Sequence, residues 1–191
     1  LVIAPGYICS NEKGDTSNLG RGGSDYSAAI YAKYLNAKVL EIWTDVSGVF
    51  SANPKIVKKA SPIEFLSYKE AMELSFFGAK VIYFPTLQPL IEDNIPVFIK
   101  NTFQPSAQGT CISNSTKLDN DEIVKGISHI ENISILNFEG SGMVGVPGFS
   151  KRFFEALSSN QINVVMITQA SSEFSICIAI NSNDAQLAKQ V

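Results

Sequence analysis

The chain has 191 residues, which at about 150 residues per domain corresponds to one large or two small domains. Hydrophobic residues make up 45% of the chain and charged residues 17%, and the mean hydropathy is +0.10, which excludes an intrinsically disordered protein. The net charge of −3 offers no basic surface to nucleic acid or an anionic membrane, and no apolar run approaches the ~18 residues of a transmembrane helix.

Cysteine and histidine content limits the possible chemistry. Cys9, Cys111 and Cys177 are an odd number of cysteines at wide spacing, which indicates a reducing compartment, the cytoplasm, and no disulfide framework. The single histidine, His129, excludes metal sites that need two histidines and leaves one possible base for a serine triad. We assign His129 no catalytic role and expect it at the surface or the edge of a core.

The two ends of the chain fall inside predicted elements. Leu1 opens an apolar run that is too short for a signal peptide, and Val191 lies within a helical pattern. We therefore expect a piece of a longer protein.

The first half of the chain alternates strand and helix patterns. Apolar residues at helical spacing predict one buried stripe, made by Ala28, Tyr31, Ala32 and Leu35. Ser67 and Glu70 form a capping box, in which each satisfies a free backbone N–H group at the start of a helix. The expected elements are a strand over 1–4, a loop over 5–23, a helix from 24, a strand over 39–43, a turn over 44–48, a helix from 67 to a stop at 78, and a strand over 96–99.

A polar stretch separates this half from the second. Residues 113–122 contain almost no core-forming side chains, and we place a linker at 114–122 between domains at 1–113 and 123–191. The second half predicts a strand over 133–138, a helix over 150–159, strands over 163–168 and 174–180, and a helix from near 184. This β-α-β-β-α order is a ferredoxin-like unit without its last strand, which leaves one sheet edge to be paired.

A glycine-rich loop stands directly before the first helix. In Gly20-Arg21-Gly22-Gly23-Ser24-Asp25, the glycines let a backbone approach a ligand, and the helix start offers unpaired N–H groups. Arg21 adds a planar fork that suits a carboxylate or phosphate, and Ser24 can cap the helix or donate to a ligand. The alternative is a flexible turn with a capped helix.

A second group of polar residues follows the strand over 39–43. Thr44 and Asp45 are placed where open α/β sheets bind ligands, at the end of a strand. Phe50 could cover a base and Lys55 could reach a phosphate. Taken alone, Lys55 is typical of a surface lysine, and Lys80 of a lysine that extends from an apolar stretch to solvent.

Three motifs together resemble the aspartokinase branch of the amino acid kinase family. Residues 20–25 match its G-R-G-G-S-D motif, residues 42–48 match I-W-T-D-V-x-G, and residues 77–81 match F-G-A-K-V. Their order and spacing agree over residues 1–113. Three further stretches are most similar to aspartokinases fused to homoserine dehydrogenase: 11–14, 99–102 and 124–128. The resemblance implies an α/β fold, the C-terminal half of an amino acid kinase domain.

The resemblance also implies an activity, ATP-dependent phosphorylation of the side-chain carboxylate of L-aspartate with Mg²⁺ bound through the nucleotide. It assigns aspartate binding to Arg21, Gly22, Gly23, Ser24 and Asp25, and ATP binding to Thr44, Asp45, Phe50, Lys55, Lys80 and Val81. No general base is expected, because a carboxylate nucleophile is already ionised near pH 7. The family's K-F-G-G element is absent from the 191 residues, so we expect this chain by itself to be inactive.

Residues 123–191 resemble an ACT domain, the small-molecule sensor of aspartokinases, and imply pairing of such domains in a homodimer or larger assembly. The glycine-rich loop over 140–148 lies where ACT domains bind amino acids, and the effector-site residues carried over are Met143, Gly148, Asn163 and Gln169. The alternative is a glycine-rich turn with polar residues that satisfy strand ends.

The predicted effector is threonine, ahead of lysine. A lysine site needs a carboxylate to pair with the buried ammonium group. The inward-facing candidates of the strand over 163–169 include no acidic residue: they are Asn163, Val165, Ile167 and Gln169. Val165 stands where lysine-sensing relatives carry Asp, and Gln169 matches the threonine-sensing bifunctional enzymes.

Two other functions stay open at this point. One is a binding module, a separate amino-acid sensor without catalysis. The other is a different amino acid kinase, for glutamate or uridylate, which would share only the T-D-V-x-G element and neither the G-R-G-G-S-D loop nor the regulatory half.

Overall fold

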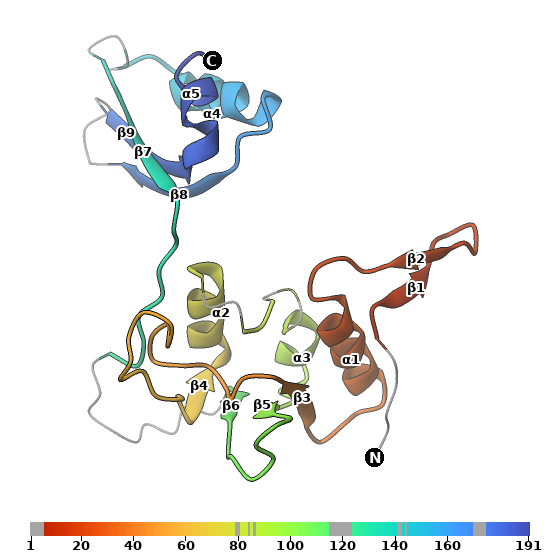
Figure 1. Cartoon of the computed structure of the whole chain (residues 1–191). Helices are drawn as coiled ribbons and strands as arrows, with labels where there is room; N and C mark the ends of the chain where they lie inside the picture. Colours follow the sequence, from red (N-terminus) through yellow and green to blue (C-terminus); the bar gives the residue numbers. More distant parts are fainter. Residues whose placement is uncertain are drawn as a thin grey trace. The chain divides into compact units, whose positions relative to one another are not determined.

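The computed structural model divides the chain into two compact units, residues 1–129 and 130–191 (Figure 1). Each unit has its own hydrophobic core. The structure describes residues 6–78, 81–83, 85, 87–114, 124–140, 143, 145–169 and 175–191. Within these residues, no helix combines the length and apolar character needed to cross a membrane.

The first unit is built around a four-stranded sheet with the order β3-β5-β6-β4. β3 is parallel to β5, β5 is antiparallel to β6, and β6 is parallel to β4. The elements of this unit are β1 (Ile8–Ser10), β2 (Thr16–Asn18), α1 (Gly23–Tyr34), β3 (Leu40–Thr44), β4 (Phe65–Ser67), α2 (Tyr68–Phe76), α3 (Gln88–Ile91), β5 (Val97–Asn101) and β6 (Thr110–Ser113).

Helices α1, α2 and α3 lie on one face of this sheet (Figure 1). The face beneath them is apolar: Ile42, Val97, Ile99 and Ile112 share a core with the helix residues. Burying such side chains contributes about 1.5–3 kcal/mol each, which is why alternate strand residues turn toward the helices. The other face exposes Val39, Trp43 and Phe65, among other residues.

The start of α2 confirms the sequence prediction in detail. The Ser67 side chain accepts a hydrogen bond from the Glu70 N–H at 3.1 Å, and the Ser67 N–H donates to the Glu70 carboxylate at 2.7 Å. The buried stripe predicted for α1 was wrong in part. Ala32 is buried, but Tyr31 and Leu35 are 50% and 58% exposed, and Ala29 takes the central core position.

The predicted loop over 5–23 contains a hairpin instead. β1 and β2 pair antiparallel, with Cys9 opposite Ser17. Strands β4 and β6 and helix α3 were also missed by the sequence analysis. These elements are three or four residues long, and the hairpin strands are mostly polar, so neither element length nor alternation of apolar residues could predict them.

The second unit confirms the predicted ferredoxin-like order. It contains β7 (Ile133–Glu139), α4 (Phe149–Ser159), β8 (Val164–Gln169), β9 (Ser175–Asn181), a 3₁₀ turn (Ser182–Asp184) and α5 (Ala185–Ala188). The sheet order is β7-β9-β8, and both outer strands are antiparallel to β9. Ile176, Ile178 and Ile180 of β9 form the centre of the second core.

The segment between the sheets belongs in part to the first unit. The predicted linker over 114–122 lies outside the described residues except for Asn114. Lys125, which the sequence analysis placed in the second domain, forms an ion pair with Glu70 of α2 at 2.9 Å, and the Ile127 N–H donates to the Ser51 carbonyl at 2.8 Å. Residues 125–127 therefore pack against the first unit.

Candidate functional site

The glycine-rich loop forms the N-terminal end of α1. Gly22 is the N-cap residue, with φ 69° and ψ 13°, and Gly20 is also left-handed, with φ 71°. The Gly23 N–H donates to the Gly20 carbonyl at 3.0 Å, and the Tyr26 N–H donates to the Gly22 carbonyl at 2.9 Å. These positions use glycine because an L-residue with a Cβ atom adopts positive φ only at a cost.

The polar side chains of this loop have different surroundings. Arg21 and Ser24 are exposed, and Ser24 lies inside α1, so it does not cap the helix as the sequence allowed. Asp25 is half-buried in the first turn, and this burial raises the pKa of its carboxyl group. The exposed guanidinium of Arg21 at a helix N-terminus is suited to binding an anion.

Thr44 and Asp45 form a polar corner at the end of β3. The Thr44 hydroxyl donates to the Asp45 carboxylate at 3.1 Å, and the Thr102 N–H donates to the Thr44 carbonyl at 2.8 Å. Asn101, opposite Thr44 in β5, is 7% exposed, and its amide donates to the Ser47 hydroxyl at 2.8 Å. The corner is thereby fixed by the neighbouring strand.

Helix α1 packs against β3. Ala29 and Ala32 of α1 are buried in one core with Ile42 of β3, and residues 35–39 join the helix to the strand. A short connection between a helix and the strand that it covers makes the two run in opposite directions. Helix α1 lies beside β3 (Figure 1), and from the opposite directions we infer that its first residues, after Gly22, are at the Thr44 end of β3.

The other predicted ATP-site residues are spread along the chain. Phe50 is half-buried and pairs with Pro62 in an isolated bridge, while Lys55 is exposed in the loop after it. Val81 packs against the first core. Lys80 lies outside the described residues.

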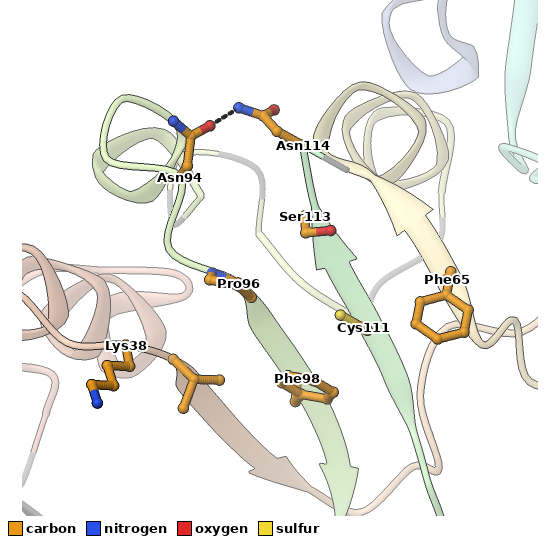
Figure 2. A pocket seen from close by; sticks show the side chains of 9 residues that line it. Lys38, Phe65, Asn94, Pro96, Phe98, Cys111, Ser113 and Asn114 are labelled. Atoms are coloured by element: carbon orange, nitrogen blue, oxygen red, sulfur yellow. Dashed lines mark hydrogen bonds between the residues drawn. The ribbon is translucent and has the colours of Figure 1, made fainter. Parts of the chain in front are cut away.

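A groove of about 580 Å³ lies on the helix-free face of the first sheet (Figure 2). Its floor is formed by three residues that are in register across β4, β6 and β5, namely Phe65, Cys111 and Phe98. Burial raises the pKa of the Cys111 thiol. Lys38 and Pro96 stand at the beginnings of β3 and β5, so the groove is at the opposite end of the sheet from Thr44. None of the predicted site residues lines it.

The predicted effector residues of the second unit fall into two groups. β7 and β8 are parallel to each other, so the loop after β7, with Met143 and Gly148, lies at the same sheet edge as Gln169. Asn163 precedes β8 and lies about 20 Å from Gln169, at ~3.3 Å per strand residue. The structure therefore places Asn163 at the opposite end of the strand.

The orientation of β8 also differs from the prediction. The register shifts between Val164 and Met166, so that Val164 is opposite Ile180, while Ile167 and Gln169 are opposite Ile178 and Ile176. Because paired residues share a face, Val164, Ile167 and Gln169 face the helices. Two of the four residues predicted to face inward, Ile167 and Gln169, therefore lie on this face, and the bulge places Val164 there as well.

Two residues that shape these sites were missed by the sequence analysis. Asn101 holds the corner at Ser47, and the ring of Tyr83 packs on Gly22. A polar residue directly after an apolar strand could have indicated Asn101. Nothing local indicates Tyr83, because its contact is with a residue about sixty positions away.

The two units of the fold correspond to two domain families. Residues 1–101 match the amino acid kinase family, and residues 136–191 match the ACT domain. The chain belongs to the amino acid kinase family.

Within that family, the chain is similar to aspartokinases. It is 48% identical to a bifunctional aspartokinase/homoserine dehydrogenase of Haemophilus influenzae, over 100% of the chain and 23% of that relative. It also resembles two structures of E. coli aspartokinase III. The complex with aspartate and ADP matches 92% of the chain and 38% of that protein, with a TM-score of 0.76 and 36% identity. The complex with lysine and aspartate matches 93% and 39%, with a TM-score of 0.70 and 33% identity. The chain thus spans about a quarter of the length of the Haemophilus relative.

Proposed function

We propose that the chain carries the aspartate-binding loop and part of the ATP site of an aspartate kinase that forms 4-phospho-L-aspartate. The observation that supports this most directly is the packing of α1, which begins in the Gly20–Asp25 loop, against β3, which ends at Thr44. The E. coli aspartokinase III structure that the chain resembles contains aspartate and ADP, the two kinds of ligand that these sites are proposed to bind.

The chemistry follows from charge and position. Arg21 would bind a carboxylate of aspartate through paired N–H donors, next to the N-terminus of α1. Thr44 and Asp45 supply hydroxyl and carboxylate oxygens, ligands that suit a nucleotide carrying Mg²⁺. The nucleotide, when bound, supplies the phosphoryl group. The chain's own residues act by holding the acceptor carboxylate, which is ionised near pH 7 and needs no general base.

Binding by the 191-residue chain tests the proposal. Asp45→Ala should weaken ADP binding and Arg21→Ala should weaken aspartate binding, each about tenfold or more, because a hydrogen bond to a charged group is worth ~1.5–3 kcal/mol. Isothermal titration calorimetry measures both, with Asp93→Ala and Arg152→Ala as matched controls at other positions. Amino-acid binding by the second unit without any response to ADP would favour the binding-module alternative.

We also propose that this chain by itself does not turn over, because the K-F-G-G element of the family does not occur in its sequence. A coupled assay for ADP release should therefore give no aspartate-dependent rate. A robust rate would contradict this proposal and leave the proposed binding sites in place.

For the second unit, we propose an amino-acid effector site at the end of the sheet where β7 and β8 finish, near Gly148 and Gln169, with threonine as the favoured ligand. β8 contains no acidic residue that could pair with a lysine ammonium group, and the exposed amide of Gln169 suits a short hydroxy-amino acid. The lysine bound to the E. coli relative favours lysine as the second candidate. Titration with each amino acid decides: heat with lysine and none with threonine would overturn the choice.

The open edge of β7 supports a further part of this proposal. β7 is an outer strand of seven residues, and such edges take up another strand readily. We expect ACT domains of two chains to associate, which sedimentation velocity of the 191-residue chain would measure.

A further inference from the structure

The loop that carries Arg21 is packed on two sides by other side chains, those of Leu19 and Tyr7 on one side and that of Tyr83 on the other. On one side, a Cβ atom at Gly23 would lie 2.9 Å from the Leu19 Cβ and 3.1 Å from the Tyr7 Cδ2. On the other side, a Cβ atom at Gly22 would lie 2.6 Å from the Tyr83 Cβ and 2.9 Å from its Cδ1. Real Cβ atoms essentially never approach other atoms within 3.0 Å, so glycine at positions 22 and 23 allows the side chains of Tyr83 and Leu19 to pack directly on the loop.

Gly20 differs from these two glycines. It is left-handed like Gly22, but no described atom comes within 4 Å of a Cβ atom built on it. The loop is therefore uncovered at Gly20, whereas the Tyr83 side chain covers it at Gly22. Arg21 stands between them and is exposed.

Tyr83 itself is fixed by the core. Ile82, the residue before it, is 4% exposed, and Val81 packs against the same cluster. Tyr83 keeps 43% of its surface exposed, so its ring covers the loop without being part of the core. An anchored neighbour limits the motion of the ring, and the ring in turn limits the motion of the Gly22 backbone.

We infer that Tyr83 is a positioning residue of the aspartate site, an inference that rests on the function proposed above. Its ring packs on Gly22 and fixes the backbone that carries Arg21. A guanidinium gains affinity for a carboxylate when its backbone is ordered before binding, because less conformational entropy is lost in the complex. The same segment also carries Val81, which is assigned to the proposed nucleotide site, whereas the Tyr83 contact described above is with Gly22 of the aspartate loop.

Tyr83 variants of the 191-residue chain test this inference. Tyr83→Ala should weaken aspartate binding about tenfold and leave ADP binding within about twofold, since it removes preorganisation from one ligand site only. Tyr83→Phe keeps the ring and should bind both ligands as the unchanged chain does. Titration calorimetry measures the two affinities, and the melting temperature shows that each variant is folded.

Amide hydrogen exchange gives a readout that needs no ligand. The Gly23 N–H, bonded to the Gly20 carbonyl, should exchange about tenfold faster in Tyr83→Ala and unchanged in Tyr83→Phe. The Cys111 N–H, bonded to the Glu64 carbonyl in the sheet, is the internal control. Unaltered exchange at Gly23 overturns the inference. Faster exchange with unaltered aspartate affinity also overturns it, because the contact would then be structural only.

Alanine substitutions at two glycines distinguish the effect of the Tyr83 contact from the effect of backbone strain. Gly20→Ala and Gly22→Ala introduce a Cβ atom at nearly the same φ, but only the second meets Tyr83. Gly22→Ala should therefore lower the melting temperature more than Gly20→Ala, and adding Tyr83→Gly, which removes the Tyr83 Cβ as well as the ring, should recover most of the difference. Equal effects of the two glycine variants would contradict the contact. If the unchanged chain binds no aspartate while Gly23 exchange still responds to Tyr83→Ala, the proposed function fails and the contact stands.

Discussion

Asp25 shows how a single residue at the site is held in an unfavourable state. Its carboxyl group is half-buried at the first turn of α1, and burial raises its pKa above the ordinary value of 3.8. The negative charge at neutral pH is favoured by the helix N-terminus but disfavoured by the loss of water around it. The raised pKa indicates that desolvation is the larger effect, a pattern common where a residue serves a ligand rather than the fold.

We expect Asp25→Asn to raise the melting temperature near pH 7 and to leave it unchanged near pH 3. A carboxyl whose pKa is raised in the folded state opposes folding when it is ionised, above its unfolded pKa, and has no such effect once both states are protonated. Thermal unfolding at the two pH values measures this, with the exposed Asp93→Asn as control. A lower melting temperature at pH 7 would show that the charged form makes a stabilising contact.

At the scale of one element, α2 is stabilised at its first turn. Ser67 and Glu70 satisfy each other's backbone N–H groups, and Lys125 pairs with the same carboxylate at 2.9 Å. Burial acts to raise the pKa of Glu70, but the hydrogen bonds from Ser67 and Lys125 act more strongly, so the pKa is lowered overall from 4.5. The ionised form is therefore the one that stabilises the helix.

Ser67→Ala should lower the free energy of unfolding by about 1 kcal/mol, the usual value of an N-cap. Glu70→Gln should also destabilise the first unit near pH 7, and its difference from the unchanged chain should shrink as the pH falls through the lowered pKa of Glu70 toward 3. Urea unfolding at several pH values measures both effects. Glu73→Gln on the exposed side of the same helix is the control, and an equal loss from it would exclude the capping interpretation.

At the scale of the whole molecule, stability is divided between two cores. Ile99 lies at the centre of the first core and Ile178 at the centre of the second, and both are 0% exposed. No side chain of one cluster belongs to the other among the described residues. Each unit can therefore lose its packing separately.

Ile99→Ala and Ile178→Ala should each cost about 2–5 kcal/mol, in different units. Hydrogen exchange followed by mass spectrometry should show faster exchange in β5 for the first variant and in β9 for the second. A loss of protection throughout the chain from either variant would mean that the two units unfold as one.

The local signals in the sequence were sufficient for the fold class and for the family. Three of these signals depend only on neighbours within a few residues: the glycines before a helix, the Thr-Asp pair after a strand and the Ser67–Glu70 capping box. They could therefore be interpreted without knowledge of the fold. The β-α-β-β-α order was likewise predicted, because strand and helix periods differ. The sequence did not show the β1–β2 hairpin, whose short polar strands carry no clear period.

Tertiary structure alone decided how these residues meet. The extra residue between Val164 and Met166 changed the inward face of β8, and the parallel direction of β7 and β8 put Gln169, without Asn163, beside the loop with Gly148. Only folding brings Tyr83 onto Gly22 and Asn101 beside Ser47. Such contacts join residues distant in the chain, and their energies depend on the register and packing of the complete fold rather than on any local pattern.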